Sequence, residues 1–402
     1  MSTQWPGGII SKTAPTITAP TGGEGGSTSG MWTLPEVMVH EKAGNWPKGV
    51  FLRELWGFGS NTVGQLGTGN TTDATTAVQI GSESYWAAIA AGLQHSCGIK
   101  TDGTLWTWGE GASGRLGHGS TTDYSSPVQV GDLTDWLSIA TGAYHMVSVK
   151  TDGTLWTWGV NANGQLGDGT TTARNSPVQI GSLTVWASCS AGRRFCTAIK
   201  TDGTLWTWGK NNHGQLGDGS NTQRNSPVQV GSDTNWKVAS GGSPVCYAIR
   251  TDGTMWAWGR NNTGQVGDGS TTVRSSPVQI GSLTTWLSLS AGYGSPLVTQ
   301  TNGTLWSWGY NPNGEIGTGN TTNYSSPVQI GSLTTWNRVS KGIFWSMATT
   351  KSNALYSWGY NVSGQLGHGN TTALSSPVQV GSLTTWLEMA GGGDQGLAFK
   401  QP

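Results

Sequence analysis

The sequence of 402 residues has little charge and few cysteines. Asp, Glu, Lys and Arg together make up 10% of it, against roughly 25% in an average domain. The net charge is zero, and the clustered positive charge that binds nucleic-acid phosphates is missing. We therefore expect no nucleic-acid partner. Four cysteines in a chain of this length are no disulfide framework, and we expect free thiols.

Long apolar runs and recognisable catalytic groups are also missing. No run of 18 apolar residues occurs, so we expect no membrane insertion. The first ten residues lack the basic start and apolar core of a signal peptide. Gly-Lys-Ser/Thr phosphate loops do not occur, and Glu110, Glu315 and Asp394 are scattered rather than paired. The sequence predicts a protein that is not an enzyme and has no cofactor and no metal ion.

Glycine and tryptophan, in contrast, are abundant, with 64 and 23 residues. Three aromatic columns recur every 50 residues. The columns are Trp56, Trp106, Trp156, Trp206, Trp256, Trp306 and Tyr356; Phe58, Trp108, Trp158, Trp208, Trp258, Trp308 and Trp358; and Trp86, Trp136, Trp186, Trp236, Trp286, Trp336 and Trp386. Residues 51–400 are therefore seven copies of 50 residues, and residues 1–50 form a different segment.

Each copy contains four short segments typical of β-strands. In the second copy they cover residues 104–108, 128–130, 136–140 and 146–150. Pro127 would open the second of these strands, where proline is tolerated. Asp-Gly pairs such as Asp102-Gly103 predict type I′ hairpin turns. Asn353-Ala354 departs from this pattern and predicts a looser turn.

Seven copies of four antiparallel strands predict an all-β fold, a seven-bladed β-propeller, preceded by an extended N-terminal arm with one short helix. A solenoid would need atypical polar caps at its ends, which the first and last copies lack. We expect the strand at 52–58 to pair with the strand at 396–400. This pairing would close one propeller over residues 51–400 and leave no free sheet edge.

A family resemblance follows from the glycine-rich loop. The sequence Trp-Gly-x-Asn-x-x-Gly-Gln-Leu-Gly-x-Gly stands at 158–169, 208–219 and 358–369, with near-copies in the other repeats. Together with Ala91-Gly92-x-x-His95, it resembles the repeat of the regulator-of-chromosome-condensation family. The resemblance implies a seven-bladed propeller, with His95 and His145 as structural histidines. It implies no single function, because members include a GTPase exchange factor, a UV-B photoreceptor, ubiquitin ligases and a secreted β-lactamase inhibitor.

Three columns diverge between copies that are otherwise nearly uniform. The first follows the Ala-Gly before the fourth strand, the second follows the Trp-Gly, and the third includes Arg174, Arg224 and Arg274. Variable loops on a rigid scaffold commonly carry binding, and aromatic residues and Arg are hot-spot types. The alternative is neutral drift after duplication. We predict a recognition face made by the first column, with Gln94, His95, Tyr144, His145, Arg193, Arg194, Phe195, Tyr293, Phe344 and Trp345.

One acidic column resembles a set of metal ligands. Asp168, Asp218 and Asp268 share it with His118 and His368. Each copy supplies one such residue, and a ring of seven is too wide for the short ligand distances of a single ion. The pattern therefore predicts that these side chains cap turns.

Residues 1–50 read as an arm that docks on another surface. Thr33 and Glu36 fit a capping box, which predicts a short helix over residues 34–43. Such a helix is too short to be stable alone in water, so we expect it to dock, either on another protein or on the propeller of its own chain. The expected anchoring residues are Trp32, Leu34, Val37 and Trp46.

The arm also resembles short segments in structural proteins of tailed marine bacteriophages. The resemblance lies in Gly-Met-Trp-Thr-Leu-x-Glu-Val and the later Ala-Gly-Asn-Trp-Pro. It implies a virion surface protein, a tail adhesin or fibre or a capsid decoration, which could form oligomers within the assembly. Residues 1–50 would bind other virion proteins, and the variable loops would bind a host surface glycan or protein. The alternative is a bacterial protein-binding or inhibitor propeller, secreted or cytoplasmic, resembling the β-lactamase inhibitor.

Overall fold

The computed structural model describes residues 2–5, 8–11 and 52–402. Contacts divide the chain into two units, Met1–Phe51 and Leu52–Pro402. In the first unit, β1 (Ser2–Trp5) pairs antiparallel with β2 (Gly8–Ser11). The predicted helix and the predicted anchoring residues lie outside the described residues; these are Trp32, Leu34, Val37 and Trp46.

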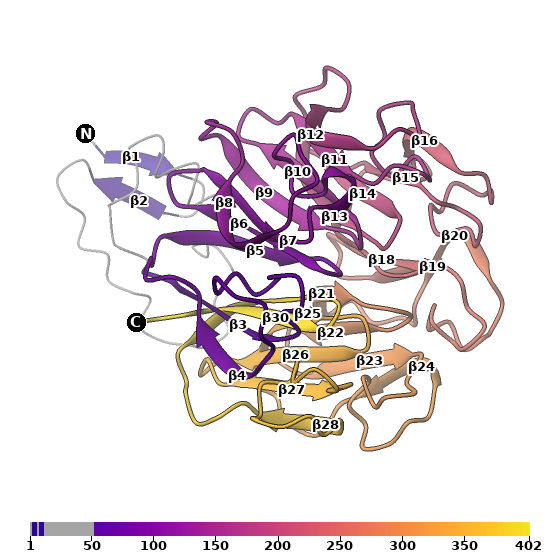
Figure 1. The fold of residues 1–402 in the computed structure, drawn as a ribbon. Coiled ribbons are helices and arrows are strands. Elements are labelled where there is room, and N and C mark those ends of the chain that lie inside the picture. Colours follow the sequence, from indigo (N-terminus) through magenta and orange to yellow (C-terminus); the bar gives the residue numbers. More distant parts are fainter. Residues whose placement is uncertain (1, 6–7, 12–51) are drawn as a thin grey trace. The chain divides into compact units, whose positions relative to one another are not determined.

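Residues 52–402 form seven four-stranded antiparallel sheets, which confirms the predicted seven-bladed propeller (Figure 1). Six sheets use four consecutive strands. The sheet that follows the first glycine-rich loop contains β5 (Trp86–Ala91), β6 (His95–Lys100), β7 (Leu105–Gly109) and β8 (Tyr124–Gln129). The first strands of neighbouring sheets contact one another, so they lie innermost, and the fourth strands lie outermost.

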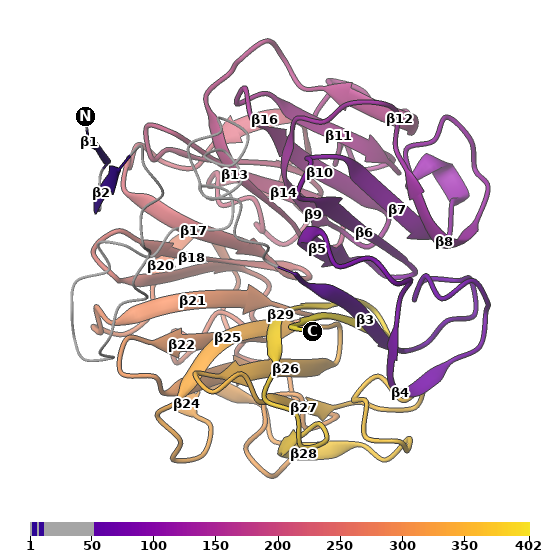
Figure 2. The same cartoon turned by 90° about the vertical axis from the view of Figure 1, so that its left-hand side faces the viewer.

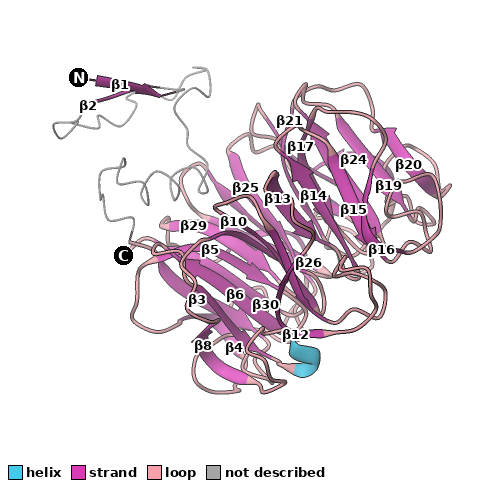
Figure 3. Ribbon diagram, turned by 90° about the horizontal axis from the view of Figure 1, so that it is seen from above, coloured by secondary structure: helices cyan, strands magenta, loops and turns pink. Residues whose placement is uncertain are grey.

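Five further sheets repeat this order. They are β9 (Trp136–Thr141), β10 (His145–Lys150), β11 (Leu155–Gly159) and β12 (Arg174–Gln179); β13 (Trp186–Ala191), β14 (Phe195–Lys200), β15 (Leu205–Gly209) and β16 (Arg224–Gln229); β17 (Trp236–Gly241), β18 (Val245–Arg250), β19 (Met255–Gly259) and β20 (Arg274–Gln279); β21 (Trp286–Ala291), β22 (Pro296–Gln300), β23 (Leu305–Gly309) and β24 (Tyr324–Gln329); β25 (Trp336–Lys341), β26 (Trp345–Thr350), β27 (Leu355–Gly359) and β28 (Leu374–Gln379). In the described residues, the one helical turn is η1 (Ala112–Gly114), drawn in cyan in Figure 3.

The seventh sheet joins the two ends of the propeller. Its order is β29 (Trp386–Gly391), β30 (Gln395–Lys400), β3 (Glu54–Gly59) and β4 (Ala74–Gln79). The register between β3 and β30 is unbroken along all six pairs. Figure 1 shows the indigo strand β3 beside the yellow strand β30, and Figure 2 shows the same junction from the side. The pairing leaves β3 with no free edge.

The tryptophan columns pack between blades. Trp108 is fully buried, and its ring centroid lies 6.0 Å from that of Trp86 in an edge-on arrangement. Its indole N–H donates to the carbonyl oxygen of Gln65 in the preceding blade at 3.0 Å. A Cβ on Gly67 would lie 2.8 Å from the same indole nitrogen, so glycine is required there. Equivalent hydrogen bonds come from Trp208, Trp258, Trp308 and Trp358.

The hairpin turns have a different geometry from the predicted type I′ turn. Gly103 has a φ of +78°, but Asp102 is not among the residues with positive φ. The loop spans three residues, because Lys100 and Thr104 pair through a 3.0 Å hydrogen bond and Gly103 N–H donates to Lys100 at 2.8 Å. This is a tight turn followed by one left-handed residue. Asn353 adopts the left-handed conformation at a φ of +60°, and its turn keeps both equivalent hydrogen bonds. The prediction of a looser turn at Asn353-Ala354 is therefore also wrong.

The outermost strand β8 begins at Tyr124, earlier than the start predicted for the strand at residues 128–130. Pro127 lies at the fourth position of β8 rather than at its start. The register between β7 and β8 shifts between Thr107 and Gly109, which interrupts the regular pairing. Because β8 is an outermost strand, its proline need not donate a hydrogen bond to another strand.

Candidate recognition face

Seven loops at one end of the innermost strands form a closed ring of backbone hydrogen bonds. Each loop donates one N–H to a carbonyl of the next blade, over 2.9 to 3.4 Å. The donors are Leu93, Ala143, Arg193, Ser243, Tyr293, Ile343 and Gly393. The ring surrounds an axial opening of about 90 Å³, which is lined mainly by glycine and other small residues. These loops, which hold the first divergent column, are therefore fixed relative to one another.

The second divergent column joins the same surface. Lys210 N–H donates to the Arg194 carbonyl at 2.9 Å, and Tyr360 N–H donates to the Phe344 carbonyl at 3.0 Å. The other five blades repeat this bond, from Ser60, Glu110, Val160, Arg260 and Tyr310. We call the combined surface the variable face: residues 93–94 and 110 with their equivalents in each blade. Sequence spacing could not bring the two columns together, because separate loops carry them.

The predicted binding residues divide into an outward and an inward group. Arg193 is exposed, and five others are partly exposed: Gln94, Tyr144, Arg194, Tyr293 and Phe344. Four side chains are at most 1% exposed and cannot reach a partner, contrary to the prediction; they are His95, His145, Phe195 and Trp345. Only six of the ten predicted binding residues are therefore accessible to a partner on the variable face.

The inward group fills the space between blades. Its members begin the second strand of each sheet, where side chains face the neighbouring blade. A Cβ on Gly92 would lie 2.2 Å from the ring of His95, and one on Gly342 would lie 2.0 Å from the indole of Trp345. The glycine three residues earlier therefore makes room for the ring. Burial also lowers the pKa of His145 to about 4, so its imidazole is neutral near pH 7.

One sector of the variable face is aromatic. The ring centroid of Tyr293 lies 5.1 Å from that of Phe344 and 6.0 Å from that of Tyr310. Phe344 also lies 6.5 Å from Tyr360. These four side chains, the aromatic cluster, come from two neighbouring blades and are all partly exposed. Clustered aromatic side chains of this kind are frequent anchors in binding surfaces.

A second sector is basic. A pocket of about 200 Å³ opens beside the aromatic cluster, and Tyr293 belongs to both. Its cationic lining residues are Arg193, Arg194, Lys210 and Arg260. The sequence marks these positions only as divergent between repeats, because their grouping depends on contacts between adjacent blades.

In other blades, the charged side chains of the variable face form ion pairs or hydrogen bonds with neighbouring residues. Arg115 forms an ion pair with Glu110 and lies 5.0 Å from the ring centroid of Tyr144. Gln365 donates to the Asp394 carboxylate at 3.1 Å, and burial, together with Asp73, raises the pKa of Asp394. This part of the variable face has fewer unpaired groups to offer a ligand.

A buried lysine lies beneath the variable face. Lys341 Nζ donates to the Glu315 carbonyl at 2.9 Å and to Ser346 Oγ at 2.8 Å. Burial lowers the pKa of Lys341 to about 8, and the Glu315 carboxylate partly opposes that shift. Burial raises the pKa of Glu315. The other repeats hold Ala, Thr or Gly in place of Lys341.

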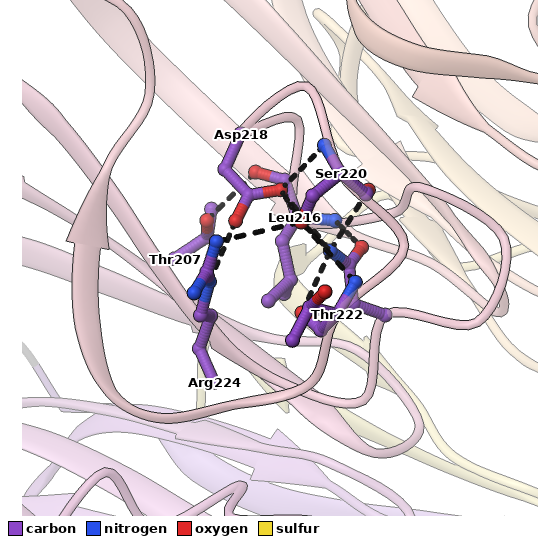
Figure 4. Close-up of polar contacts among 7 residues, drawn as sticks. Thr207, Leu216, Asp218, Ser220, Thr222 and Arg224 are labelled. Carbon is purple, nitrogen blue, oxygen red and sulfur yellow. Dashed lines mark hydrogen bonds and ion pairs between the residues drawn. The ribbon is translucent and has the colours of Figure 1, made fainter.

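The arginines of the third divergent column begin the fourth strands of their sheets and stabilise the glycine-rich loops that precede them. Asp218 Oδ1 accepts hydrogen bonds from the Ser220 N–H at 3.0 Å and its hydroxyl at 2.8 Å, and Arg224 donates to Oδ2 at 2.7 Å (Figure 4). Asn211 completes the loop by accepting from the Leu216 N–H at 3.0 Å. Asp168 and Asp268 accept the equivalent bonds, so the aspartates of the acidic column cap turns, as predicted. The two histidines of that column do not; they contact the hydroxyls of Thr107 and Ser357 instead.

The described residues contain neither a disulfide bond nor a cluster of metal-binding side chains. All four cysteines are free, and Cys196 and Cys246 are buried. Within residues 52–402 and the short β1–β2 hairpin, no group of three His, Cys, Asp or Glu side chains could hold a metal ion. Over the same residues, no helix is long and apolar enough to cross a membrane.

The repeats and their closed ring define a class of protein, the repeat-built β-propellers. The family model "Regulator of chromosome condensation (RCC1) repeat" matches residues 54–99, 102–149, 152–199, 202–249, 252–295, 302–348 and 352–399. A second RCC1 repeat model matches residues 86–115, 136–165 and 187–215. The chain belongs to the RCC1 repeat family. No curated protein matches the sequence.

Solved structures share the fold. Prp20p from Saccharomyces cerevisiae has a TM-score of 0.79 at 17% identity, over 88% of this chain and 93% of that chain. Human WBSCR16 has a TM-score of 0.77 at 20% identity, over 87% of this chain and 99% of that chain. Prp20p is described with its binding properties to Gsp1p and histones, and another structure shows Kap60 bound to it. At these identities the likeness concerns the fold alone.

Proposed function

We propose that this protein is a non-catalytic recognition module that binds a macromolecular partner through the variable face. The observation that carries the proposal is the meeting of two divergent sequence columns on one ring of hydrogen-bonded loops. A rigid ring lowers the entropic cost of binding, because the contact residues are held in place before the partner arrives. Protein binding by the similar propeller of Prp20p is consistent with this role.

The distribution of paired and unpaired arginine side chains favours the variable face as the binding surface. Arg174, Arg224 and Arg274 of the third column are paired with aspartates in their own loops. On the variable face, Arg193 and Arg194 have no such pair among the described residues, and four aromatic rings are partly exposed. Drift in exposed loops would not concentrate hot-spot residue types on one surface.

In its specific form, the proposal concerns a bacteriophage virion. Residues 1–50 would anchor the propeller to other virion proteins, as a tail adhesin or fibre or as a capsid decoration. The variable face would then bind a host surface glycan or protein. The support is the resemblance of residues 30–47 to phage structural proteins. The alternative is a bacterial protein-binding or inhibitor propeller that uses the same face.

The face can be tested with one double variant and a matched control. Fluorescently labelled full-length chain is applied to a glycan array and to intact cells of the host strain. We expect Tyr293→Ala with Phe344→Ala to lose binding by about tenfold or more. Tyr324→Ala with Leu333→Ala, which truncates two side chains on an outer surface away from the variable face, should bind like the wild type. Equal binding by all three proteins contradicts the proposed face.

The location needs a separate experiment. Phage particles are purified by density gradient from the source culture and analysed by mass spectrometry. Co-purification at a fixed ratio to the major capsid protein supports the virion location. Recovery only from cells or from the culture supernatant contradicts it and favours the bacterial alternative.

A further inference from the structure

Most of the described lysine and arginine side chains that lack an ion pair, a contact with an aromatic ring or a buried hydrogen bond line the basic pocket of the variable face. Ten of the described lysines and arginines form ion pairs, Lys200 lies over two tryptophan rings, and Lys341 donates buried hydrogen bonds. Of the described residues, six basic side chains have no such contact. Two of these, Lys237 and Lys351, are exposed elsewhere, and the other four line this pocket: Arg193, Arg194, Lys210 and Arg260.

The repeats show that the scaffold does not require these cations. The positions equivalent to Arg194 in the other blades hold Gln94, Tyr144, Pro244, Gly294, Phe344 and Asp394. The five other residues at the positions of Lys210 and Arg260 carry no positive charge, and one is acidic: Ser60, Glu110, Val160, Tyr310 and Tyr360. Positive charge is therefore specific to two neighbouring blades. In a chain with no net charge, such a concentration indicates an anionic ligand.

The positive charges of the pocket have no negatively charged side chain beside them in its lining. No acidic side chain lines it. The pKa of His213 is lowered by burial and then by the positive charges of Arg260 and Lys210. Arg260 Nε donates to Asn262 Oδ1 at 2.7 Å, which fixes that guanidinium and leaves its two outer nitrogens for a ligand. Planar guanidinium groups bind carboxylates and sulfates through paired hydrogen bonds.

The rest of the lining suits a hydroxylated ring. Asn212, Gln215 and Ser243 contribute amide and hydroxyl groups, and Tyr293 contributes an aromatic wall. A volume of about 200 Å³ holds one sugar ring and exceeds the needs of a free inorganic ion. An aromatic wall packs against the apolar C–H face of such a ring. A long nucleic acid would need positive charge along a track, whereas these cations occupy one pocket.

We propose that this pocket binds an acidic sugar residue, with its carboxylate or sulfate held by Arg194 and Arg260 and its ring packed on Tyr293. The inference rests on the proposed function and names the chemistry of the partner as an anionic glycan. Arg193 and Lys210 add positive charge at the rim and favour association with a polyanionic chain.

Isothermal titration calorimetry of the full-length chain tests the proposal. The probes are tetrasaccharides of hyaluronan, polygalacturonate and chondroitin 4-sulfate, with cellotetraose, a tetraglutamate peptide and sodium sulfate for comparison. We expect at least one acidic tetrasaccharide to bind, and its Kd to rise about tenfold or more in Arg194→Gln with Arg260→Gln. Lys237→Gln with Lys351→Gln removes the same charge outside the pocket and should leave Kd unchanged.

Each other outcome overturns the assignment. Equal weakening by both double variants indicates unspecific charge attraction. Binding of cellotetraose as tight as that of the acidic sugars removes the role of the anion. Binding of the peptide or of sulfate alone, or of no probe, contradicts a sugar-acid site. Unfolding midpoints of both variants, measured in parallel, confirm that the proteins are folded.

A spectroscopic readout locates the ligand. Bound anion should raise the pKa of His213, because it stabilises the imidazolium against Arg260 and Lys210; NMR titration of the histidine rings measures this shift. His118, which lies in another blade, should not respond. If acidic sugars fail while Tyr293→Ala with Phe344→Ala still abolishes binding to cells, the recognition face stands and the acidic-sugar site is wrong.

Discussion

The glycine-rich loops and the variable face are both built from polar loops, repeated seven times on one scaffold, yet they use their side chains in opposite ways. In the glycine-rich loops, Asn211 and Asp218 bond within one loop, and Arg224 at the start of β16 donates back to Asp218. On the variable face, Arg194 and Lys210 bond through their backbones and leave their side chains unpaired among the described residues. The difference separates residues that hold the fold from residues available to a ligand.

The strongest test of this comparison replaces a tryptophan between blades. Trp258 is fully buried and donates to the Gln215 carbonyl at 3.0 Å. We expect Trp258→Ala to lower the free energy of unfolding by about 3–5 kcal/mol, measured by urea denaturation. Tyr310→Ala on the variable face should cost far less. Similar losses in both variants would remove the distinction between scaffold and face.

A pair of adjacent asparagines tests the loop itself. Asn211 is 1% exposed and bonds to the backbone of Leu216, Ser220 and Thr222, whereas Asn212 is exposed. Asn211→Ala leaves the buried Leu216 N–H unpaired and removes two further bonds, to the carbonyls of Ser220 and Thr222, so it should cost roughly 2–3 kcal/mol. Asn212→Ala should change the free energy of unfolding by less than about 0.5 kcal/mol. Equal effects in thermal or chemical unfolding would contradict the bonding pattern.

The buried lysine makes a prediction about pH. The pKa of Lys341 is about 8 in the folded protein and 10.5 in an unperturbed lysine, so the unfolded state binds more protons between these values. Stability contributed by this group therefore rises as pH rises from 8 to 10.5. We expect the wild type to gain at least about 1 kcal/mol relative to Lys341→Met over that interval. A constant difference would show that Lys341 titrates normally.

The smallest expected effect distinguishes two kinds of arginine. Arg224 forms a partly exposed ion pair with Asp218, so Arg224→Ala should cost only about 0.2–1 kcal/mol. Arg194 has no ion pair among the described residues, and Arg194→Ala should leave the unfolding midpoint unchanged. A loss for Arg194→Ala as large as for Arg224→Ala would assign Arg194 to the scaffold.

The period of 50 residues was sufficient to predict the propeller, because repetition places each copy in the same environment. Within a divergent loop, the sequence could not tell which side chain points inward. His95 and Trp345 look like ligand-binding residues until the strand that begins with them is seen to face Gly92 and Gly342. The glycine three residues before was the available signal. The basic pocket could not be predicted from the sequence, because its lining residues come from different blades that meet only in the folded protein.

The junction between β3 and β30 has a consequence for synthesis. Six sheets consist of strands that leave the ribosome in succession, so each can pair as it appears. The sheet containing β3 must wait for Gln395–Lys400, more than three hundred residues later. Until then β3 and β4 expose an edge to neighbouring chains. Pairing with β30 therefore ends the period in which the edge of β3 is open to misassembly with another chain.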